Sequence, residues 1–366
     1  MEEKTPKKSE LKKSCTNCGA ELLYAPGTTE LKCEYCGYTQ AITVSENSFE
    51  ELELKTYLSE MGSQSYSEEI TMIQCENCGA NQHVEENYKS LSCIYCATPL
   101  IIEDMYTEEW IIPGAVLPFQ IDQKKAHSIF QKWVKGLWFA PNKLKKATLD
   151  PQNTKGLYSP YWTFDAQLYA DYTGQRGEHY YVTKTVGSGK NRRTIQQQKT
   201  RWYPATGNVK GFVDDTLTKA SKQKAGIIPK EIASWNLKLL QPFDSSFLAG
   251  FVTEKYTIPL KSGHEQAEKV ARNIADSWAR RDIGGDAQRI YSLEVTLSEE
   301  TFKHILLPVY ISAYTFKSKR YNFFVNGQSG KLSGQRPYSA WKIFFFILGI
   351  LFVLFLIYLF LSKGGI

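Results

Sequence analysis

Residues 15–37 read CTNCGAELLYAPGTTELKCEYCG, and this stretch decides how the N-terminal part of the chain folds. Its four cysteines follow the spacing C-x2-C-x14-C-x2-C. The same spacing returns in residues 75–97, CENCGANQHVEENYKSLSCIYCA, so the two copies contain all 8 cysteines of the protein. Each CxxC pair can place two sulfur atoms on one edge of a tetrahedron, and two such pairs are typical of a closed four-cysteine metal site.

We therefore predict two structural zinc ions, one held by Cys15, Cys18, Cys33 and Cys36 and the other by Cys75, Cys78, Cys93 and Cys96. Short strand-like runs between the pairs predict a zinc ribbon, a small β module without a core of its own. Metal binding then contributes about 10–16 kcal/mol and is inseparable from folding. Disulfides are disfavoured because no secretory signal is found. Redox CxxC sites usually occur singly, and rubredoxin-type iron sites have a longer gap between the pairs.

Charge is divided unevenly along the chain. Residues 1–110 contain 20 acidic and 8 basic side chains, whereas residues 111–366 contain 18 acidic and 36 basic ones. Each zinc ion bound by four thiolates adds two more negative charges to the N-terminal part. Such a surface disfavours a phosphate backbone as its ligand.

The order of these patterns predicts an α+β protein in six segments. They are a charged tail (1–14), a zinc ribbon (15–40), an acidic linker with a short helix (41–70), a second ribbon (71–104), an α+β domain with mainly antiparallel sheet (105–338) and a transmembrane helix (341–361). Within the α+β domain, helices are expected after Asp122, as the N-cap, and over 264–278. Strands are expected over 158–172, 180–186, 194–203, 290–295, 305–316 and 320–325.

Residues 343–361 are 19 consecutive uncharged residues, long enough to span a hydrocarbon core of about 30 Å. Trp341 and Lys342 stand at one boundary, as interfacial anchors do. Lys331 and Arg336 also precede the span, and only Lys363 follows it. The positive-inside rule then predicts a single-pass, tail-anchored protein of the cytoplasmic membrane with most of the chain in the cytosol.

A basic hairpin is expected around residues 187–189, because residues 179–213 contain no acidic side chain. Its candidate anion-binding residues are Lys184, Lys190, Arg192, Arg193, Lys199 and Arg201. The ligand is either the anionic headgroups of the membrane or the phosphates of a nucleic acid, and a plain solvated loop is the remaining possibility. Lipid is preferred because the anchor already supplies that surface.

No catalytic constellation is found. The run before Lys190 is not a phosphate-binding loop, because G-x-x-x-x-G-K-[ST] requires glycine where Lys184 stands and Ser or Thr where Asn191 stands. His264, His304, Asp282 and Asp286 have no spacing that indicates an acid–base site. The sequence therefore predicts no enzyme and no small-molecule substrate.

Two resemblances can be stated. The cysteine pairs resemble the ribbons of general transcription factors and of small RNA polymerase subunits. More of the chain resembles a group of uncharacterised, mostly bacterial membrane proteins with N-terminal zinc ribbons, through LYSPYWTFDA at 157–166, DIGGD at 282–286, TFKHILLP at 301–308 and VNGQSG at 325–330. Members of that group are sometimes labelled primosomal helicase-like, but neither a P-loop nor a DEAH-type box exists here. The resemblance implies a topology and a domain layout, and no activity.

The leading functional hypothesis is a non-enzymatic interaction module, in which the acidic ribbons recruit a cytosolic protein while the basic domain lies against anionic lipid. The alternative is a membrane-tethered nucleic-acid-binding protein that uses the hairpin at 184–201.

Overall fold

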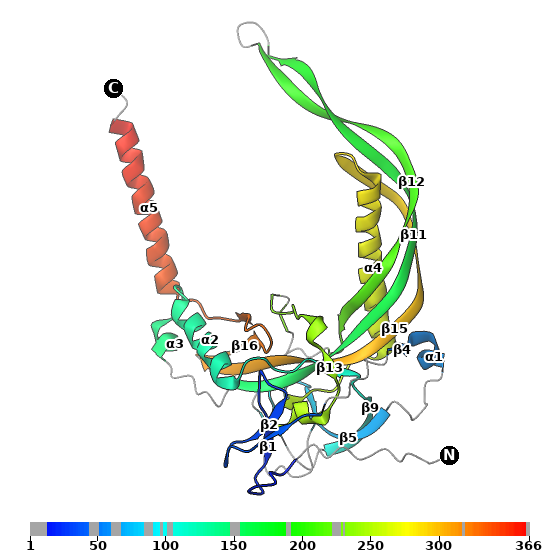
Figure 1. The fold of residues 1–366 in the computed structure, drawn as a ribbon. Helices are drawn as coiled ribbons and strands as arrows, with labels where there is room; N and C mark the ends of the chain where they lie inside the picture. The colour runs from blue at the N-terminus through cyan, green and yellow to red at the C-terminus, as the bar shows by residue number, and fades with distance from the viewer. Residues whose placement is uncertain are drawn as a thin grey trace.

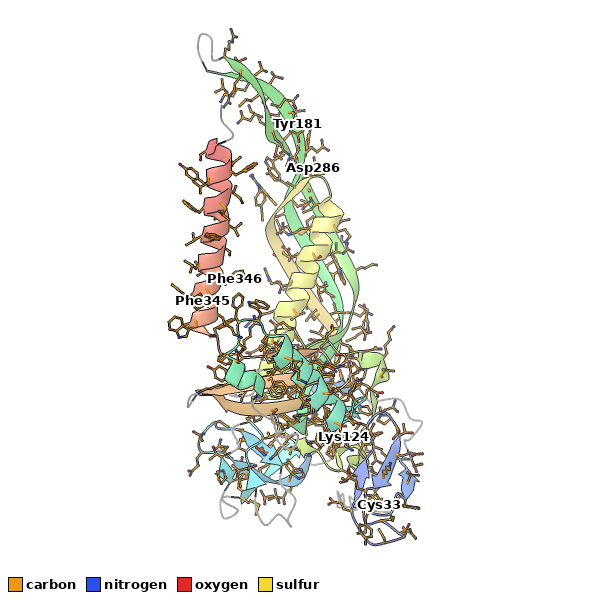
Figure 2. All side chains as sticks on the ribbon, turned by 90° about the vertical axis from the view of Figure 1, so that its left-hand side faces the viewer. Cys33, Lys124, Tyr181, Asp286, Phe345 and Phe346 are labelled. Carbon is orange, nitrogen blue, oxygen red and sulfur yellow. The ribbon has the colours of Figure 1, made fainter. Side chains whose placement is uncertain are left out.

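Two long projections leave the same side of a strand-rich body: an arm of β-strands and one apolar helix (Figure 1). The segments that carry the cysteines lie on the opposite side, and in the second view Cys33 is at the far end of the molecule from Tyr181 on the arm (Figure 2). The computed structural model describes residues 13–43, 51–59, 67–83, 91–95, 98–100, 105–146, 154–187, 192–221, 228–229, 231–316 and 319–363. The mixed, strand-rich character predicted from the sequence is confirmed.

Nine strands form the central sheet among these described residues: β4 (Leu52–Glu53), β10 (Ala115–Val116), β11 (Thr154–Val186), β12 (Arg193–Lys219), β13 (Gln241–Pro242), β14 (Val252–Thr253), β15 (Ala287–Phe316), β16 (Lys319–Asn326) and β17 (Leu332–Gly334). The order along the sheet is β12-β11-β15-β10-β13, and the other four strands extend it at β11, β15 and β16. Pairing is antiparallel except for β10–β15 and β11–β14.

Strands β11, β12 and β15 are much longer than ordinary strands and continue beyond the body as the arm (Figure 1). They contain 33, 27 and 30 residues, whereas about five or six is usual. β11 pairs with β12 from Tyr161 to Val186, which confirms the hairpin expected before Arg193. The separate strands expected over 158–172 and 180–186 are one strand. Gly174 lies inside this strand. The carbonyl oxygen of Arg289 approaches so closely there that a side chain would not fit.

Helix α4 (Leu260–Ile283) lies along the arm and includes the helix predicted over 264–278. Its buried face carries an alanine every four residues, at Ala267, Ala271, Ala275 and Ala279. These small side chains let the helix approach Leu168 and Ala170 of β11 closely. A Cβ atom at Gly211 of β12 would lie 2.7 Å from the Trp278 ring, so the sheet has no room for a side chain there. Glycine and alanine therefore set the helix-to-sheet distance.

The sheet curves between the body and the arm (Figure 1). We use the term elbow for the level of Asp165, Asp215 and Glu299, where the backbone is irregular. Pairing shifts register on both sides of Asp165, toward β12 and toward β15. Asp215 and Glu299 have positive φ angles of 49° and 52°, a region that residues other than glycine seldom adopt. Bulges bend a strand and increase its twist, so a double bulge at this level contributes to the curvature.

The remaining helices are α1 (Leu54–Ser59), α2 (Gln123–Gly136), α3 (Asn142–Lys146), the 3-10 helices η5 (Leu237–Leu239) and η6 (Ser245–Leu248), and α5 (Ala340–Lys363). Of these helices, α2 and α5 are long and the others are short. Asp122 caps α2 as predicted, since its carboxylate accepts the backbone N–H of Lys125 at 2.6 Å. Within the described chain, α5 is the one helix long and apolar enough to cross a membrane; its mean hydropathy is 3.1 and it is not buried.

The cysteine-bearing segments form three small sheets: β1 (Leu22–Tyr24), β2 (Glu30–Cys33) and β3 (Thr39–Ala41); β5 (Ser67–Gln74), β6 (Asn81–His83) and β9 (Met105–Ile111); and β7 (Leu91–Ser92) with β8 (Pro99–Leu100). These segments share the hydrophobic core of the body. Cys15 and Cys33 belong to one buried cluster with Tyr158 of β11. Cys75 and Cys93 belong to another, which includes residues of β10, β11 and β15. The buried cysteines of each centre therefore belong to a hydrophobic core that extends to the central sheet.

Candidate metal centres

The first candidate metal centre consists of Cys15, Cys18, Cys33 and Cys36, whose sulfur atoms all lie within 4.8 Å of one another. The sulfurs of Cys15 and Cys36 are 3.5 Å apart, and those of Cys18 and Cys33 are 3.6 Å apart. Metal–sulfur bonds of about 2.3 Å in a tetrahedron give sulfur–sulfur edges of about 3.8 Å. The four side chains can therefore close around one metal ion with little movement.

Glycines that follow the second cysteine of a pair fix the backbone of this centre. Gly19 and Gly37 have φ angles of 74° and 76°, and their N–H groups donate to the carbonyl oxygens of Cys15 and Cys33 at 2.8 and 3.0 Å. Glycine takes this left-handed conformation without a steric cost. The resulting turns bring both sulfurs of each pair to the same side, as the sequence predicted.

The second candidate centre repeats this arrangement with Cys75, Cys78 and Cys93, whose sulfurs also lie within 4.8 Å of one another. The sulfurs of Cys78 and Cys93 are 3.4 Å apart. Gly79 has a φ of 73° and its N–H group donates to the carbonyl oxygen of Cys75 at 2.7 Å. The predicted fourth ligand, Cys96, lies outside the described residues.

The first centre is joined to the body through Tyr24 of β1, which lies between its two cysteine pairs. The Tyr24 N–H group donates to the carbonyl oxygen of Ala249 at 3.1 Å, and its ring packs edge-on against Phe247 with centroids 5.3 Å apart. Its hydroxyl group donates to the carbonyl oxygen of Thr28 at 2.8 Å and lies 3.3 Å from that of Phe119. Burial raises the pKa of Tyr24 well above its ordinary value, so the hydroxyl group stays a hydrogen-bond donor.

The second centre is joined to the body through Tyr95. This tyrosine is buried, and its hydroxyl group donates to Oε2 of Glu254 at 2.5 Å. The same buried carboxylate accepts the hydroxyl of Ser221 at 2.5 Å and lies 3.5 Å from that of Ser159 in β11. Gln82 of β6 forms an isolated β-bridge with Glu254. The carboxylate of Glu254, with hydroxyl partners from three segments, and its backbone bridge to Gln82 thus tie this centre to the sheet.

The outer surface of the centres is acidic and carries an exposed aromatic ring. Between Cys33 and Cys36, Tyr35 is 86% exposed and its neighbour Glu34 is also exposed. Glu21 in the same segment is exposed as well, and Glu69 and Glu76 are exposed in the segment of the second centre. This surface points away from the arm and from α5 (Figures 1 and 2).

The elbow contains a third group of possible metal ligands, which the sequence pattern did not reveal. The carboxylates of Asp165, Asp214 and Asp215 lie within 4.8 Å of one another. Lys303 supplies the positive charge there: its Nζ is 3.6 Å from Oδ2 of Asp165 and 3.4 Å from Oδ1 of Asp215, and it donates to Glu51 at 3.0 Å. An ammonium group of the chain therefore already neutralises part of this cluster.

Protonation of the elbow follows from this geometry. Burial raises the pKa of Asp165 to about 6, although the N–H group of Asp215 and the charge of Lys303 oppose the rise. Burial alone would lower the pKa of Lys303, but its hydrogen bond to Glu51 and the nearby aspartates raise it overall. Both groups are therefore charged at neutral pH, and the pair holds β15 to β11 where the arm begins.

The predicted anion-binding residues gather on one face of the arm. Side chains directly opposite in an antiparallel pair point to the same side and alternate along the strand. The register places Lys184, Arg193, Lys199 and Arg201 on one face, which we call the cationic face. On its other face, residues 179–185 and 194–202 present Thr, Gln, His, Tyr and Trp side chains and no lysine or arginine. Arg192 is exposed beside Arg193, and Lys190 lies outside the described residues.

The cationic face continues the face of the sheet that α4 covers nearer the body. There Leu168, Ala170 and Tyr172 are buried under the alanines of α4. The pairing of β11 with β12 has no further register shift between Ala166 and Val186, so the same face runs on to the end of the strands. Beyond α4 it is uncovered, and its apolar residues Val186 and Ile195 are 36% and 39% exposed.

The two histidines singled out in the sequence have structural partners. His304 is buried between the rings of Trp110, Trp162 and Tyr256, and its Nδ1 is 2.7 Å from the carbonyl oxygen of Ile111. Burial lowers the pKa of His304 to about 4. The Nε2 of His264, at the start of α4, is 2.5 Å from Oε2 of Glu300. Neither environment is a polar pocket open to a substrate.

Comparison with known proteins finds one informative similarity. No protein-family model matches the chain. The uncharacterized protein YdjG of Bacillus subtilis (strain 168) is 24% identical over 338 residues, which cover 90% of this chain and 91% of that protein. The similarity extends over most of both chains. Its name assigns no activity, and the comparisons provide no evidence of enzymatic function.

Proposed function

We propose that this is a tail-anchored protein of the cytoplasmic membrane, in which two zinc-loaded cysteine centres hold an interaction surface for a cytosolic protein. Helix α5 is the single span in this proposal, and the body lies in the cytosol. The observation that carries it is the environment of α5. Its apolar side chains are exposed along the whole length, which water disfavours and a bilayer satisfies.

The start of α5 is bonded to the body, which supports its role as an anchor. Lys342 donates to the carbonyl oxygens of Trp138 and Ala140 at 3.2 and 2.8 Å and to Oδ1 of Asn142 at 2.7 Å. The ring of Phe346 packs edge-on against Phe139, with centroids 5.2 Å apart. Trp138 and Trp341 beside them are 73% and 72% exposed, and tryptophan is enriched at the membrane–water interface.

The direction of α5 supports a cytosolic position for the cysteine centres. A bilayer that receives α5 lies on the side of the body toward which the helix projects, and the centres are on the opposite side (Figure 1). Lys331, Arg336 and Lys342 precede the span, and the positive-inside rule places them in the cytosol. Thiolate ligands also require the reducing conditions of that compartment.

Zinc is the metal that we assign to both centres. Two CxxC pairs supply four soft thiolates at tetrahedral spacing, the set that structural zinc sites use. Four sulfurs close the coordination sphere of the first centre, so the metal there has no open position for a substrate.

The exposed surface around Tyr35 is the part that we assign to partner binding. Exposed tyrosines often contribute much of the affinity at protein interfaces. The surrounding acidic side chains favour a partner with a basic surface, since charge complementarity steers association. Tyr35 lies between two ligands of the first centre, so metal binding there fixes the backbone that carries it.

The anchor is tested by fractionating cells that express the full chain. The protein should sediment with membranes and resist extraction by alkaline carbonate. A variant with Leu348, Leu351 and Phe355 changed to lysine should be released, because lysine inside the span opposes insertion. A carbonate-soluble wild-type protein would contradict the anchor.

The partner surface is tested by photo-crosslinking in cells. A photoreactive amino acid replaces Tyr35 in one protein and Tyr291, 64% exposed on the arm, in the matched control. We expect a discrete crosslinked protein from position 35, lost in a Glu34→Lys variant that still binds two zinc ions. Equal crosslinking from both positions, or from neither, would contradict a specific partner at this surface.

A further inference from the structure

The arm lies in the path of any bilayer that α5 enters, because both project from the same side of the body (Figures 1 and 2). This argument rests on the membrane anchoring proposed above. The arm cannot follow α5 into hydrocarbon, since charged side chains there are strongly disfavoured. Exposed charges occur along its length, at Asp171, Lys210, Glu294, Lys261, Lys269 and Arg281. The arm therefore has to meet the bilayer at the headgroup layer.

The cationic face has the composition that such a meeting requires. Four cations, Lys184, Arg193, Lys199 and Arg201, share the face with the partly exposed apolar residues Val182, Val186 and Ile195. Nearer α4 the same face carries Glu178, whose charge is paired with Arg176 at 3.0 Å. Long basic side chains can keep their charge at phosphate level while their stems, and neighbouring aliphatic groups, contact the apolar boundary. Tyr180 and Tyr203 lie on the same face, and tyrosine favours this interface.

The same details favour lipid over nucleic acid. A surface for single-stranded nucleic acid offers open aromatic rings on which bases stack. On this face the guanidinium of Arg201 lies over the Tyr180 ring, 5.3 Å from its centroid, so that ring is already occupied on one side. The apolar members exposed between the cations are aliphatic, and aliphatic groups add nothing to phosphate recognition.

We infer that the cationic face of the arm lies on anionic lipid headgroups of the same membrane that α5 crosses. The arm reaches them by flexing in its outer part, the two-stranded ribbon of β11 and β12 beyond the ends of α4 and β15. The joint at the start of α5 keeps its place, because Lys342 and Phe346 tie it to the segment between α2 and α3 and to Asn142 of α3. The protein then contacts one membrane at two separated places.

The test uses the full chain in lipid nanodiscs of phosphatidylcholine, with or without phosphatidylglycerol. An environment-sensitive fluorescent amino acid replaces Ile195 on the cationic face, or Gln196 on the opposite face as the matched control. We expect the emission at position 195 to shift to the blue in anionic discs only. The shift should disappear at about 0.5 M salt, where screening acts over a few ångströms, and position 196 should not respond.

Two charge variants distinguish an effect of the cationic face from an effect of the protein's net charge. The first combines Lys184→Gln, Arg193→Gln, Lys199→Gln and Arg201→Gln, and we expect it to abolish the shift. The second combines Lys210→Gln, Lys261→Gln, Lys269→Gln and Arg281→Gln, and it removes the same number of charges from other exposed positions. We expect that control to keep the shift.

A second readout separates this inference from the anchor. Lipids brominated near the headgroup should quench Trp341, measured as the quenching lost in Trp341→Phe. If Trp341 is quenched and position 195 is silent, the lipid contact of the arm is wrong and the anchor stands. If Trp341 is not quenched either, the anchor is wrong. If DNA or RNA shifts the emission at position 195 and anionic lipid does not, the ligand is nucleic acid and the lipid inference is overturned.

Discussion

The hydroxyl group of Tyr95 donates a 2.5 Å hydrogen bond to the buried carboxylate of Glu254, 159 residues further along the chain. Tyr95 comes two residues after Cys93, and Glu254 follows directly on β14, so the bond links a metal centre to the central sheet. Burial, together with the neighbouring charge of Glu254, raises the pKa of Tyr95 well above its ordinary value. The tyrosine therefore donates at every physiological pH.

Tyr95→Phe should lower the free energy of unfolding by about 1–3 kcal/mol, because the buried carboxylate of Glu254 loses a donor. Chemical denaturation measures the change. The zinc content should stay at two ions per chain, since no cysteine is altered. Tyr35→Phe is the matched control, and at 86% exposure it should have no effect on unfolding. Equal effects of the two substitutions would show that the link to Glu254 adds nothing.

Cys33→Ser and Cys93→Ser should each reduce the metal content from two zinc ions to one, as measured by elemental analysis of purified protein. Both cysteines are buried in the cores that include strands of the central sheet. Loss of either ion should therefore lower the stability of the whole body and not only of one small sheet. Retention of two ions, or an unchanged unfolding midpoint, would contradict this coupling.

Lys303→Met should destabilise the protein by about 3–5 kcal/mol, because it leaves the buried Asp165 without its cation. Adding Asp165→Asn should restore part of that loss, since the amide is neutral and its oxygen can still accept the N–H group of Asp215. Thermal or denaturant unfolding measures both. Arg280→Met breaks the exposed pair with Asp276 and should cost less than about 1 kcal/mol. A double variant no more stable than Lys303→Met would exclude this account of the elbow.

Acid should weaken the body through His304. Its pKa is about 4 when folded and 6.5 in the unfolded chain, so the unfolded state binds the extra proton between these values. The free energy of unfolding should fall by about 3 kcal/mol for this group as pH drops from 6.5 to 4. The stabilising contribution of neutral His304 is fully present above pH 6.5.

His304→Asn should flatten this pH dependence, because the amide does not titrate and can still donate to the carbonyl oxygen of Ile111. Unfolding curves at several pH values, compared with the wild type, give the slope. His179→Asn, at an exposed position, should leave the slope unchanged. Identical slopes for the wild type and His304→Asn would remove His304 as the cause.

Local patterns in the sequence predicted local features well. The spacing of Cys15, Cys18, Cys33 and Cys36 predicted that four sulfurs converge, and Asp122 predicted the start of α2. The uncharged run at 343–361 predicted a helix over 341–361, and α5 extends it by one residue at its start and two at its end. These features depend on residues near one another in the chain, where spacing and capping rules apply.

Features that join distant residues were not predictable. The sequence predicts several separate strands, because glycines such as Gly174 and Gly177 normally weaken a strand. In the structure, close contacts with β15 and β12 accommodate these glycines within one strand. The elbow was missed because Glu51, Asp165, Asp215 and Lys303 meet only through the register of the sheet. The basic residues of the hairpin were found, but their gathering on one face required the pairing of β11 with β12. The domain boundaries and the role of the cysteines as zinc ligands stay predictions.

Helix α4 and strand β15 support the arm along only part of its length. α4 ends at Ile283 and β15 begins at Ala287 opposite Gly177, so both supports stop at the same level, where Asp286 accepts the N–H group of His179 at 2.7 Å. Beneath that level the arm is a helix packed on three strands, and above it a bare two-stranded ribbon. Bending stiffness rises steeply with thickness, so a load applied near the turn will flex the ribbon and leave the thicker shaft nearly still. The last stretch can thus follow an uneven or moving surface without disturbing the metal centres at the far end.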